Sequence, residues 1–394
     1  MSKKAFKYRL YPTKEQEATL QETLERLREL YNAALQERKD AYKLQKKSIT
    51  YNQQANQLPE IKEIRPEYKD IHSQVLQDTL RRVDKAMQNF FRRVKNGEKP
   101  GYPRFKGYNR FDSFTYPQVG FALDAEGKHI SLSKIGNIKV KLHRKIEGKM
   151  KTCTVKREID HWYIVLSCEI EDTKQLPDNI EVVGIDMGVT HFATLSTGET
   201  IENPRQFRRA EKRLEKLQQK LAKKKKGSHR RGKAKKAVAK LHRKIKNQRK
   251  DFLHKQSRKL VNAYGTVVFE KLQTANITRR PKPKRDDKTG EYLPNGATAK
   301  AGLNKSILDA GWYQFQQYCT YKAESAGRAV LFVSPNYTSQ ACSGCGQIRK
   351  KTLAERWHSC ECGTELDRDH NAAINILRLG SSQQVTISVE APCL

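Results

Sequence analysis

The sequence has no long hydrophobic run. None of its apolar stretches approaches the ~18–20 residues that span a bilayer, and no apolar signal core follows the basic first residues. These absences exclude a membrane-spanning helix, and we expect an intracellular protein with no membrane partner. With 394 residues, the chain is long enough for about two to four domains.

Acidic residues are also in short supply. The chain has 43 aspartates and glutamates against 78 lysines and arginines, which gives a formal net charge of +35. Like charges at this density repel one another unless a polyanion neutralises them, so the balance predicts a nucleic-acid partner. The excess is concentrated, because residues 205–259 hold 25 lysines and arginines and only three acids.

Cysteine is sparse outside one short segment. Four of the eight cysteines are scattered, and the others form two knuckles that are each followed by glycine. Such a cluster predicts one structural, tetrahedral Zn²⁺ rather than a disulfide framework, with the ligands Cys342, Cys345, Cys360 and Cys362. Because the second knuckle has one intervening residue where two are commoner, His358 remains open as an alternative ligand.

Three acids belong to short apolar elements. Asp186 lies in a β-branched run that ends at Gly188, and Glu270 ends a second such run. Asp369 opens a helical pattern, with Asp367 two residues before it. A single acid in a strand is equally compatible with capping a turn. Three acids in the order strand, strand, helix favour a shared site.

These acids belong to a series of short motifs that resembles the transposon-encoded TnpB (OrfB) family, RNA-guided DNA endonucleases related to type V CRISPR effectors. The motifs cover nearly the whole chain: Tyr8–Pro12, Gly101–Lys106, Gly184–Gly188, Asn247–Asp251, the cysteine cluster and Asp367–Ala373. The resemblance implies a RuvC or RNase H-like nuclease domain with a zinc ribbon, and a helical recognition lobe that contacts guide and target.

Apolar periodicity predicts the remaining architecture. Helical stripes follow the first strand and recur over 76–94, and short alternating runs over 111–170 predict an antiparallel β-barrel, the wedge domain. A single helix is expected from near Asn304 to Ala326. The expected α+β and α/β multidomain chain has a first barrel strand at 1–12, a recognition lobe at 13–98, the wedge barrel at 99–176, the nuclease at 177–338 with a basic helical hairpin at 205–259 and a flexible loop at 279–302, the zinc ribbon at 339–365, the last nuclease helix at 366–380 and a dispensable tail at 381–394.

In the implied nuclease, Asp186, Glu270 and Asp369 are both the catalytic residues and the ligands of two Mg²⁺ ions. Two divalent ions ~3.5–4 Å apart activate the attacking water and stabilise the leaving oxygen of a phosphodiester. Mg²⁺ prefers oxygen ligands. The family pattern puts the ligand next to His370–Ala373, which leaves Asp367, the competing acid, as a helix N-cap or supporting group.

Basic and aromatic residues are expected to contact nucleic acid. Two helical stripes flank a lysine-rich tip within 205–259, which predicts a hairpin that holds a structured guide RNA, with a solvated face as the alternative. The segment 101–106 mixes cations with aromatic residues, and packing against the next domain is the alternative there. The expected contacts are Tyr102, Arg104, Phe105, Lys106, Lys223, Lys224, Lys225, Lys226, Arg230, Arg231 and Arg249.

The implied function is hydrolysis of guide-matched double-stranded DNA beside a short flanking motif. The guide RNA would be transcribed from the transposon end, and the protein would work in the prokaryotic cytoplasm, at the nucleoid. The alternatives are a nuclease-silent RNA-guided repressor, which would have lost acids of the triad, and an accessory transposase in DNA recombination. No two of the ten histidines are two residues apart, which excludes the His-hydrophobic-His chemistry of single-strand transposases. The sequence does not define an oligomeric state.

Overall fold

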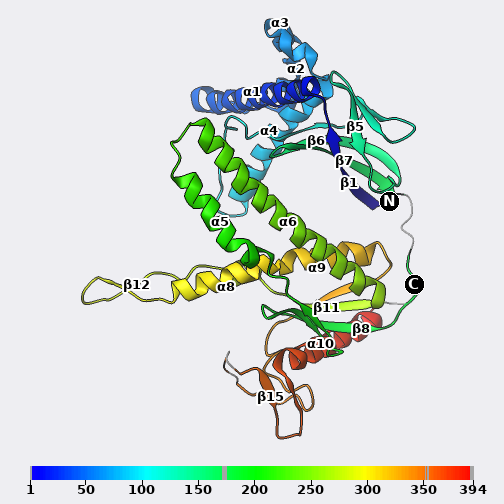
Figure 1. Ribbon diagram of the computed structural model, residues 1–394, viewed down its shortest axis with the longest axis vertical. Helices are drawn as coiled ribbons and strands as arrows, with labels where there is room; N and C mark the ends of the chain where they lie inside the picture. Colours follow the sequence, from blue (N-terminus) through cyan, green and yellow to red (C-terminus); the bar gives the residue numbers. More distant parts are fainter. Residues whose placement is uncertain (1, 171–174, 351, 353–354, 391–394) are drawn as a thin grey trace. The chain divides into compact units, whose positions relative to one another are not determined.

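The computed structural model of the chain describes residues 2–170, 175–350, 352 and 355–390, and side chains through residue 382. The chain divides into two compact units, residues 1–172 and 173–394, which are described separately (Figure 1). In the described part of the chain, none of the helices is long and apolar enough to cross a bilayer.

A seven-stranded antiparallel sheet forms the centre of the first unit, in the order β2-β6-β7-β1-β5-β4-β3 (Figure 1). Its edge strands, β2 and β3, are joined by residues 117–120 alone. Because seven flat strands about 4.8 Å apart are far wider than this link can reach, the sheet must curl until its edges approach, as the predicted barrel requires. The strands are β1 Ser2–Tyr11, β2 Ser113–Tyr116, β3 Phe121–Leu123, β4 His129–Leu132, β5 Gly136–Lys141, β6 Lys149–Glu158 and β7 His161–Ile170.

Helices α1 and α4 form the bundle of the first unit where the apolar stripes predict them. A capping box starts α1: Thr13 Oγ1 accepts from the Gln16 amide, and Gln16 Oε1 accepts from the Thr13 amide. The buried stripe of α4 ends earlier than expected, because Val94 is half exposed. The elements are α1 Lys14–Gln45, α2 Tyr51–Asn56, α3 Leu58–Ile64, the 3₁₀ helix η1 Pro66–Asp70 and α4 Ser73–Lys95.

A five-stranded mixed sheet, in the order β10-β9-β8-β11-β14, forms the centre of the second unit. Alternate residues of β11 face two helical layers: Phe269 packs with Phe315 of α9, whereas Val268 packs with Ile376 of α10. The sheet therefore lies between helices. Its strands are β8 Val182–Met187, β9 His191–Leu195, β10 Thr200–Glu202, β11 Thr266–Glu270 and β14 Ala329–Val333, and the covering helices are α9 Trp312–Glu324 and α10 Arg368–Glu390.

Two long helices, α5 (Gln206–Ala222) and α6 (His229–Ala263), form the predicted basic hairpin (Figure 1, green). They pack through a small apolar cluster of Leu214, Leu241 and Ile245. The buried carboxylate of Asp309 accepts hydrogen bonds from the amides of Phe207 (2.8 and 2.9 Å) and Arg208 (3.3 Å), which attaches the start of α5 to α8 (Ala297–Ala310). The hairpin is thus anchored at its base and exposed at its tip.

Gly311 divides the helix that was expected to run unbroken from Asn304 to Ala326. It adopts φ 74°, the left-handed conformation that ends α8 and starts α9. Helix α8 also begins at Ala297 rather than near Asn304, because the alanine-rich stretch after Gly296 favours helix. The expected flexible loop at 279–302 is correspondingly shorter, and it contains a ladder of β12 (Lys284–Arg285) and β13 (Tyr292–Leu293).

The last nuclease helix extends into the segment that was expected to be a tail, residues 381–394. Helix α10 continues through Glu390, because no proline interrupts the sequence after Gly380 until Pro392. Residues 391–394, the last part of that tail, lie outside the described residues.

Candidate functional site

Asp186 and Glu270 follow one register on adjacent parallel strands. Strand β11 pairs with β8 so that Phe269 lies opposite Ile185, and the next residue on each strand is the acid. Because side chains alternate along a strand, both acids share the sheet face that α10 covers. The two acids therefore lie side by side near the carboxyl ends of the strands.

Helix α10 carries the third acid, Asp369, in its first turn. Gly184 of β8 permits the helix to lie directly on the strand: a Cβ at this position would be 2.2 Å from the Ala373 carbonyl oxygen and 2.5 Å from the Leu377 amide nitrogen. No other residue leaves room for this approach. The glycine thereby helps to place Asp369 close enough to Asp186 to influence its pKa.

Asp367 caps α10. Its Oδ1 accepts hydrogen bonds from the amides of Asp369 (2.8 Å) and His370 (3.3 Å), which is the N-cap arrangement. The Asp367 side chain is exposed, whereas that of Asp369 is only 17% exposed. Of the two acids in this motif, Asp369 is the one whose charge raises the pKa of Asp186.

The charges of Glu270 and Asp369 disfavour the ionised form of Asp186. Burial, followed by the charges of Glu270 and Asp369, raises the pKa of Asp186 to about 8, and Arg368 opposes this rise. Burial also raises the pKa of Glu270, although a hydrogen bond from Thr338 acts in the opposite direction. Carboxylates in this situation are stabilised as anions when a divalent cation binds, and their oxygen donors suit Mg²⁺.

The acids converge less tightly than the cysteines. In the described part of the chain, the four cysteines are the one set of three or more potential ligands whose donor atoms lie within metal-binding reach of one another. The Oδ1 atom of Asp369 lies 3.4 Å from the Arg368 guanidinium, which offsets part of the repulsion among the acids.

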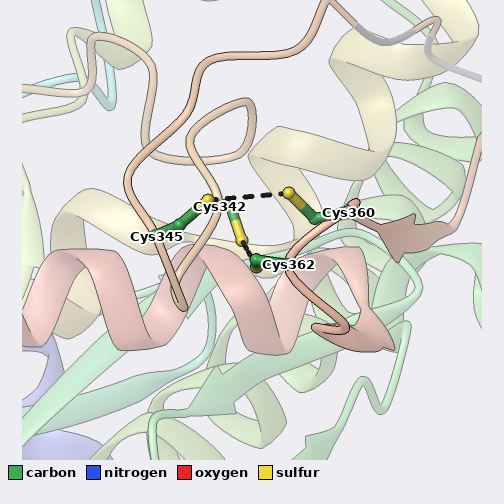
Figure 2. Close-up of side chains that lie close together, drawn as sticks. All are labelled: Cys342, Cys345, Cys360 and Cys362. Atoms are coloured by element: carbon green, nitrogen blue, oxygen red, sulfur yellow. Dashed lines mark hydrogen bonds between the residues drawn. The ribbon is translucent and has the colours of Figure 1, made fainter.

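The cysteine cluster fits a tetrahedral zinc ion (Figure 2). All four Sγ atoms lie within 4.8 Å of one another, and the pairs Cys342–Cys362 and Cys345–Cys360 are each 3.6 Å apart. Four Zn–S bonds of about 2.3 Å in a tetrahedron put the sulfurs about 3.8 Å apart. The second knuckle lies between the antiparallel strands β15 (Trp357–Ser359) and β16 (Glu365–Asp367).

His358 is not one of the grouped ligands, which are the four cysteines alone among the described residues. Its side chain is 1% exposed and hydrogen-bonds Cys342. Burial favours the neutral Cys342 thiol, but hydrogen bonds from the Cys345 amide, His358 and the Gly344 amide outweigh burial and lower its pKa to about 5. A thiolate at neutral pH is the form that binds zinc.

The cations expected to bind nucleic acid fall into two groups. Lys223, Lys224, Lys225, Lys226 and Arg230 are exposed at or near the tip of the hairpin. Arg231, in contrast, donates to the carbonyls of Leu221 (3.0 Å) and Lys224 (2.8 Å), which closes the turn. Arg249 donates to the Leu308 carbonyl (2.7 Å) near the end of α8. Both of these arginines therefore stabilise the fold through hydrogen bonds to backbone carbonyls.

The segment 101–106 is partly open to solvent. Tyr102 and Phe105 are 43% and 47% exposed, and Arg104 is exposed too. The Tyr102 ring meets Phe90 edge to face at 5.3 Å between centroids.

Lys106, at the end of this segment, lines a hollow of about 380 Å³. The buried rings of Tyr31 and Phe111 lie in its wall, and Lys85 and Arg110 are further cations around it. The Lys106 ammonium lies over the Tyr31 ring, 5.3 Å from its centroid.

Sequence analysis missed several residues that hold the site. Thr338 donates to the Glu270 carboxylate, and Gln316 Nε2 donates to the Glu270 carbonyl (3.1 Å). Asn371 and Asn375 of α10 bind the segment before the first knuckle. The spacing of two amides four residues apart on one helix is the signal that could have found the last pair.

A five-stranded sheet of this order, with helices on both faces, is the arrangement of an RNase H-like domain. Three family models match the chain: "Probable transposase" over residues 165–280, "Cas12f1-like, TNB domain" over 312–376 and "Helix-turn-helix domain" over 1–47. The last name does not describe this structure, in which this segment forms one strand, β1 (Ser2–Tyr11), and one long helix, α1 (Lys14–Gln45).

Curated relatives cover nearly the full length. "Putative RNA-guided DNA endonuclease InsQ" of Escherichia coli is 35% identical over 95% of this chain and 92% of its own. "Putative RNA-guided DNA endonuclease" of Streptomyces pristinaespiralis is 35% identical over 96% of this chain and 89% of its own. The chain belongs to the TnpB (OrfB) family of these relatives. The protein in "Cryo-EM structure of the Cas12f1-sgRNA-target DNA complex" shares the fold, with a TM-score of 0.50 at 15% identity, over 95% of this chain and 98% of that one.

Proposed function

We propose that the protein is an RNA-guided DNA endonuclease that hydrolyses double-stranded DNA matched to its guide, beside a short flanking motif. The observation that carries this proposal is the placement of Asp186, Glu270 and Asp369 around one end of the sheet, with the pKa of Asp186 raised by burial and then by the charges of the other two acids. The names of the full-length relatives support the same activity.

In this proposal, Asp186, Glu270 and Asp369 hold two Mg²⁺ ions, which when bound lower the pKa of the attacking water and stabilise the leaving oxygen. The chain fixes the geometry beforehand: two hydrogen-bonded strands hold Asp186 and Glu270, and α10 holds Asp369. Because the pKa of Asp186 is about 8, metal binding at neutral pH is expected to release a proton from it.

The four cysteines hold one structural zinc ion in this proposal, and they have no part in activating water. Such a closed site leaves no position for a substrate. Its contribution is to stabilise the loop that precedes α10.

The guide RNA is proposed to lie on the basic hairpin. Segment 101–106 is proposed to contact the nucleic-acid strands, with its cations on phosphates and its aromatic rings stacked on bases. In RNA-guided nucleases, base pairing with the guide reads the target sequence, and the protein reads backbone shape and a short flanking motif. Because its proposed target is DNA, the protein is proposed to work in the cytoplasm of a prokaryotic cell, at the nucleoid.

The presence of all three acids argues against the nuclease-silent repressor. The family model named "Probable transposase" keeps a role in DNA recombination as the alternative. The chain, however, lacks the histidine pair of single-strand transposases. Cutting of transposon-related DNA by the proposed nuclease is compatible with that description.

The test is guide-directed binding and Mg²⁺-dependent cutting of matched duplex DNA by Asp186→Ala, Glu270→Ala and Asp369→Ala. Each change should abolish cutting by orders of magnitude and leave binding intact, because the lost charge stabilises only the transition state. Asp367→Ser is the matched control, since serine removes the carboxylate and keeps the N-cap. Loss of cutting in that control with normal cutting by Asp369→Ala would reassign the ligand, and normal cutting by Asp186→Ala would refute the nuclease.

A further inference from the structure

The cysteine cluster and Glu270 are connected by hydrogen bonds from residues that belong to neither site. At one end, Thr338 Oγ1 donates to Glu270 Oε1. Both residues are buried, at 5% and 8% exposure, so water does not compete strongly for this bond. Thr338 lies only four residues before Cys342, the buried member of the first knuckle.

Helix α10 fixes the segment between them. Asn375 Nδ2 donates to the carbonyls of Thr338 (2.9 Å) and Ala341 (2.7 Å). One turn earlier, Asn371 Nδ2 donates to the same Ala341 carbonyl (2.7 Å), and its Oδ1 accepts from the Ser343 amide (2.9 Å). These bonds set the register of segment 338–343 against the helix.

Burying two side-chain amides on a helix face costs desolvation free energy, which their hydrogen bonds must offset. Asn371 is fully buried and Asn375 is 7% exposed, and apolar residues would fill such positions without the need for polar partners. Residues four apart lie on one helical face, so both amides reach the same segment. The same helix carries Asp369 two residues before Asn371, so one rigid element aligns the third acid with the support of Glu270.

We propose that Thr338 is a positioning residue for the Glu270 carboxylate, and that the zinc-bound first knuckle holds Thr338 in place with Asn371 and Asn375. The proposal rests on the proposed function, in which Glu270 is a metal ligand. The Thr338 hydroxyl donates its hydrogen bond to Oε1 of Glu270 and so restricts rotation of the carboxylate. The carboxylate is therefore held in one orientation for the cation. Zinc thereby supports metal binding by the acids without contacting DNA.

The first experiment compares Thr338→Val, which keeps the shape and removes the hydroxyl, with Thr338→Ser, which keeps the hydroxyl. Mn²⁺ binding to the full-length protein, freed of nucleic acid, is measured by electron paramagnetic resonance. We expect the dissociation constant to rise about tenfold in Thr338→Val, the size typical of a lost support for a ligand, and to stay within about twofold of wild type in Thr338→Ser. Zinc content should stay unchanged in both. Wild-type Mn²⁺ affinity in Thr338→Val, or equal losses in both variants, would overturn the proposal.

The second experiment removes zinc with Cys345→Ser plus Cys360→Ser, which leaves the buried Cys342 in place. We expect zinc to be lost and Mn²⁺ affinity to fall about tenfold, while guide RNA retention remains. Mn²⁺ affinity that is unaffected by the loss of zinc would refute the link between the two centres.

Asp186→Ala separates the inference from the function on which it rests. If this variant loses Mn²⁺ binding while Thr338→Val binds normally, the acid site stands and the positioning role is wrong. If Asp186→Ala itself binds Mn²⁺ like wild type, the proposed metal site fails, and the positioning role is overturned with it.

Discussion

At the scale of single residues, the decisive property of the site is the cost of charging Asp186. Its side chain is partly buried and lies near two further acids, so the folded protein favours the protonated form and the pKa rises from 3.8 to about 8. A raised pKa means that the contribution of this group to stability is present below the unfolded pKa and is lost as the pH rises towards the folded pKa. The site therefore destabilises the metal-free protein at neutral pH.

We predict that Asp186→Asn stabilises the metal-free protein, because the amide cannot ionise. The gain should grow between about pH 5 and pH 8, with an upper limit of about 1.4 kcal/mol per pH unit, and level off above pH 8. The measurement is the thermal midpoint of both proteins in chelator across that range. Asp367→Asn, at the exposed cap, is the matched control for the loss of a carboxylate outside the buried position. A gain at Asp186 that does not depend on pH would contradict the raised pKa.

The acids and the cysteines could be found in the sequence because their chemistry requires particular residue types. Thr338, Asn371 and Asn375 could not be assigned in this way, since threonine and asparagine occur in many surroundings and their partners are backbone carbonyls and a carboxylate. Gly184 is intermediate: a glycine in a strand signals a close approach, but only the structure identifies α10 as the element that approaches.

At the scale of elements, the basic hairpin combines an apolar seam with a charged tip. The tip is closed by Arg231, whose guanidinium binds carbonyls at the end of α5, so one of the expected RNA contacts serves the turn itself. The lysines that precede it are exposed and have no such task. Charge removal at the tip can thus be separated from damage to the turn.

We predict that neutralising Lys223, Lys224, Lys225, Lys226 and Arg230 with glutamine, with Arg231 intact, weakens guide RNA retention and flattens its salt dependence. Each lost phosphate contact should reduce the slope of log affinity against log salt by about 0.7–0.9. The control removes five exposed cations elsewhere in the same unit: Arg279, Arg280, Lys282, Lys284 and Lys288. If the two variants show equal slopes of log affinity against log salt in a series from low to high salt, the hairpin is a solvated face rather than an RNA-binding surface.

Helices and strands could be predicted where one hydrophobic periodicity runs through the whole segment. They were predicted wrongly where a single residue ends a helix within such a pattern, or where the pattern is weak. The stripes of α1 and the alternating strands of the barrel are long or repeated, so they were recognised. Gly311 was overlooked because helical residues surround it on both sides, although its left-handed φ ends one helix and starts another. The length of α10 was underestimated because the residues after Gly380 have weak helix preferences but include no early breaker.

At the scale of the whole molecule, the net charge of +35 has opposite consequences for the free and the bound protein. Without nucleic acid, the positive charges repel one another and reduce the stability of the compact state, most of all in the segment 205–259. With RNA bound, the same charges stabilise the complex through phosphate contacts and the release of counterions. Salt screens both effects, and the Debye length is already about 8–10 Å at 0.1–0.15 M.

We therefore predict that salt changes the thermal midpoint in opposite directions. Raising ionic strength from about 0.1 to 0.5 M should raise the midpoint of the RNA-free protein, because the repulsion is screened. The same change should lower the midpoint of the guide-bound protein, because a weaker complex contributes less linkage stabilisation. Differential scanning fluorimetry on both forms provides the measurement, with KCl compared with potassium glutamate to separate screening from specific anion binding. The five-cation hairpin variant should show a smaller response in each form. A midpoint of the RNA-free protein that does not rise with salt would mean that charge repulsion does not limit its stability, and a midpoint of the guide-bound protein that does not fall would mean that phosphate contacts do not dominate the stability of the complex.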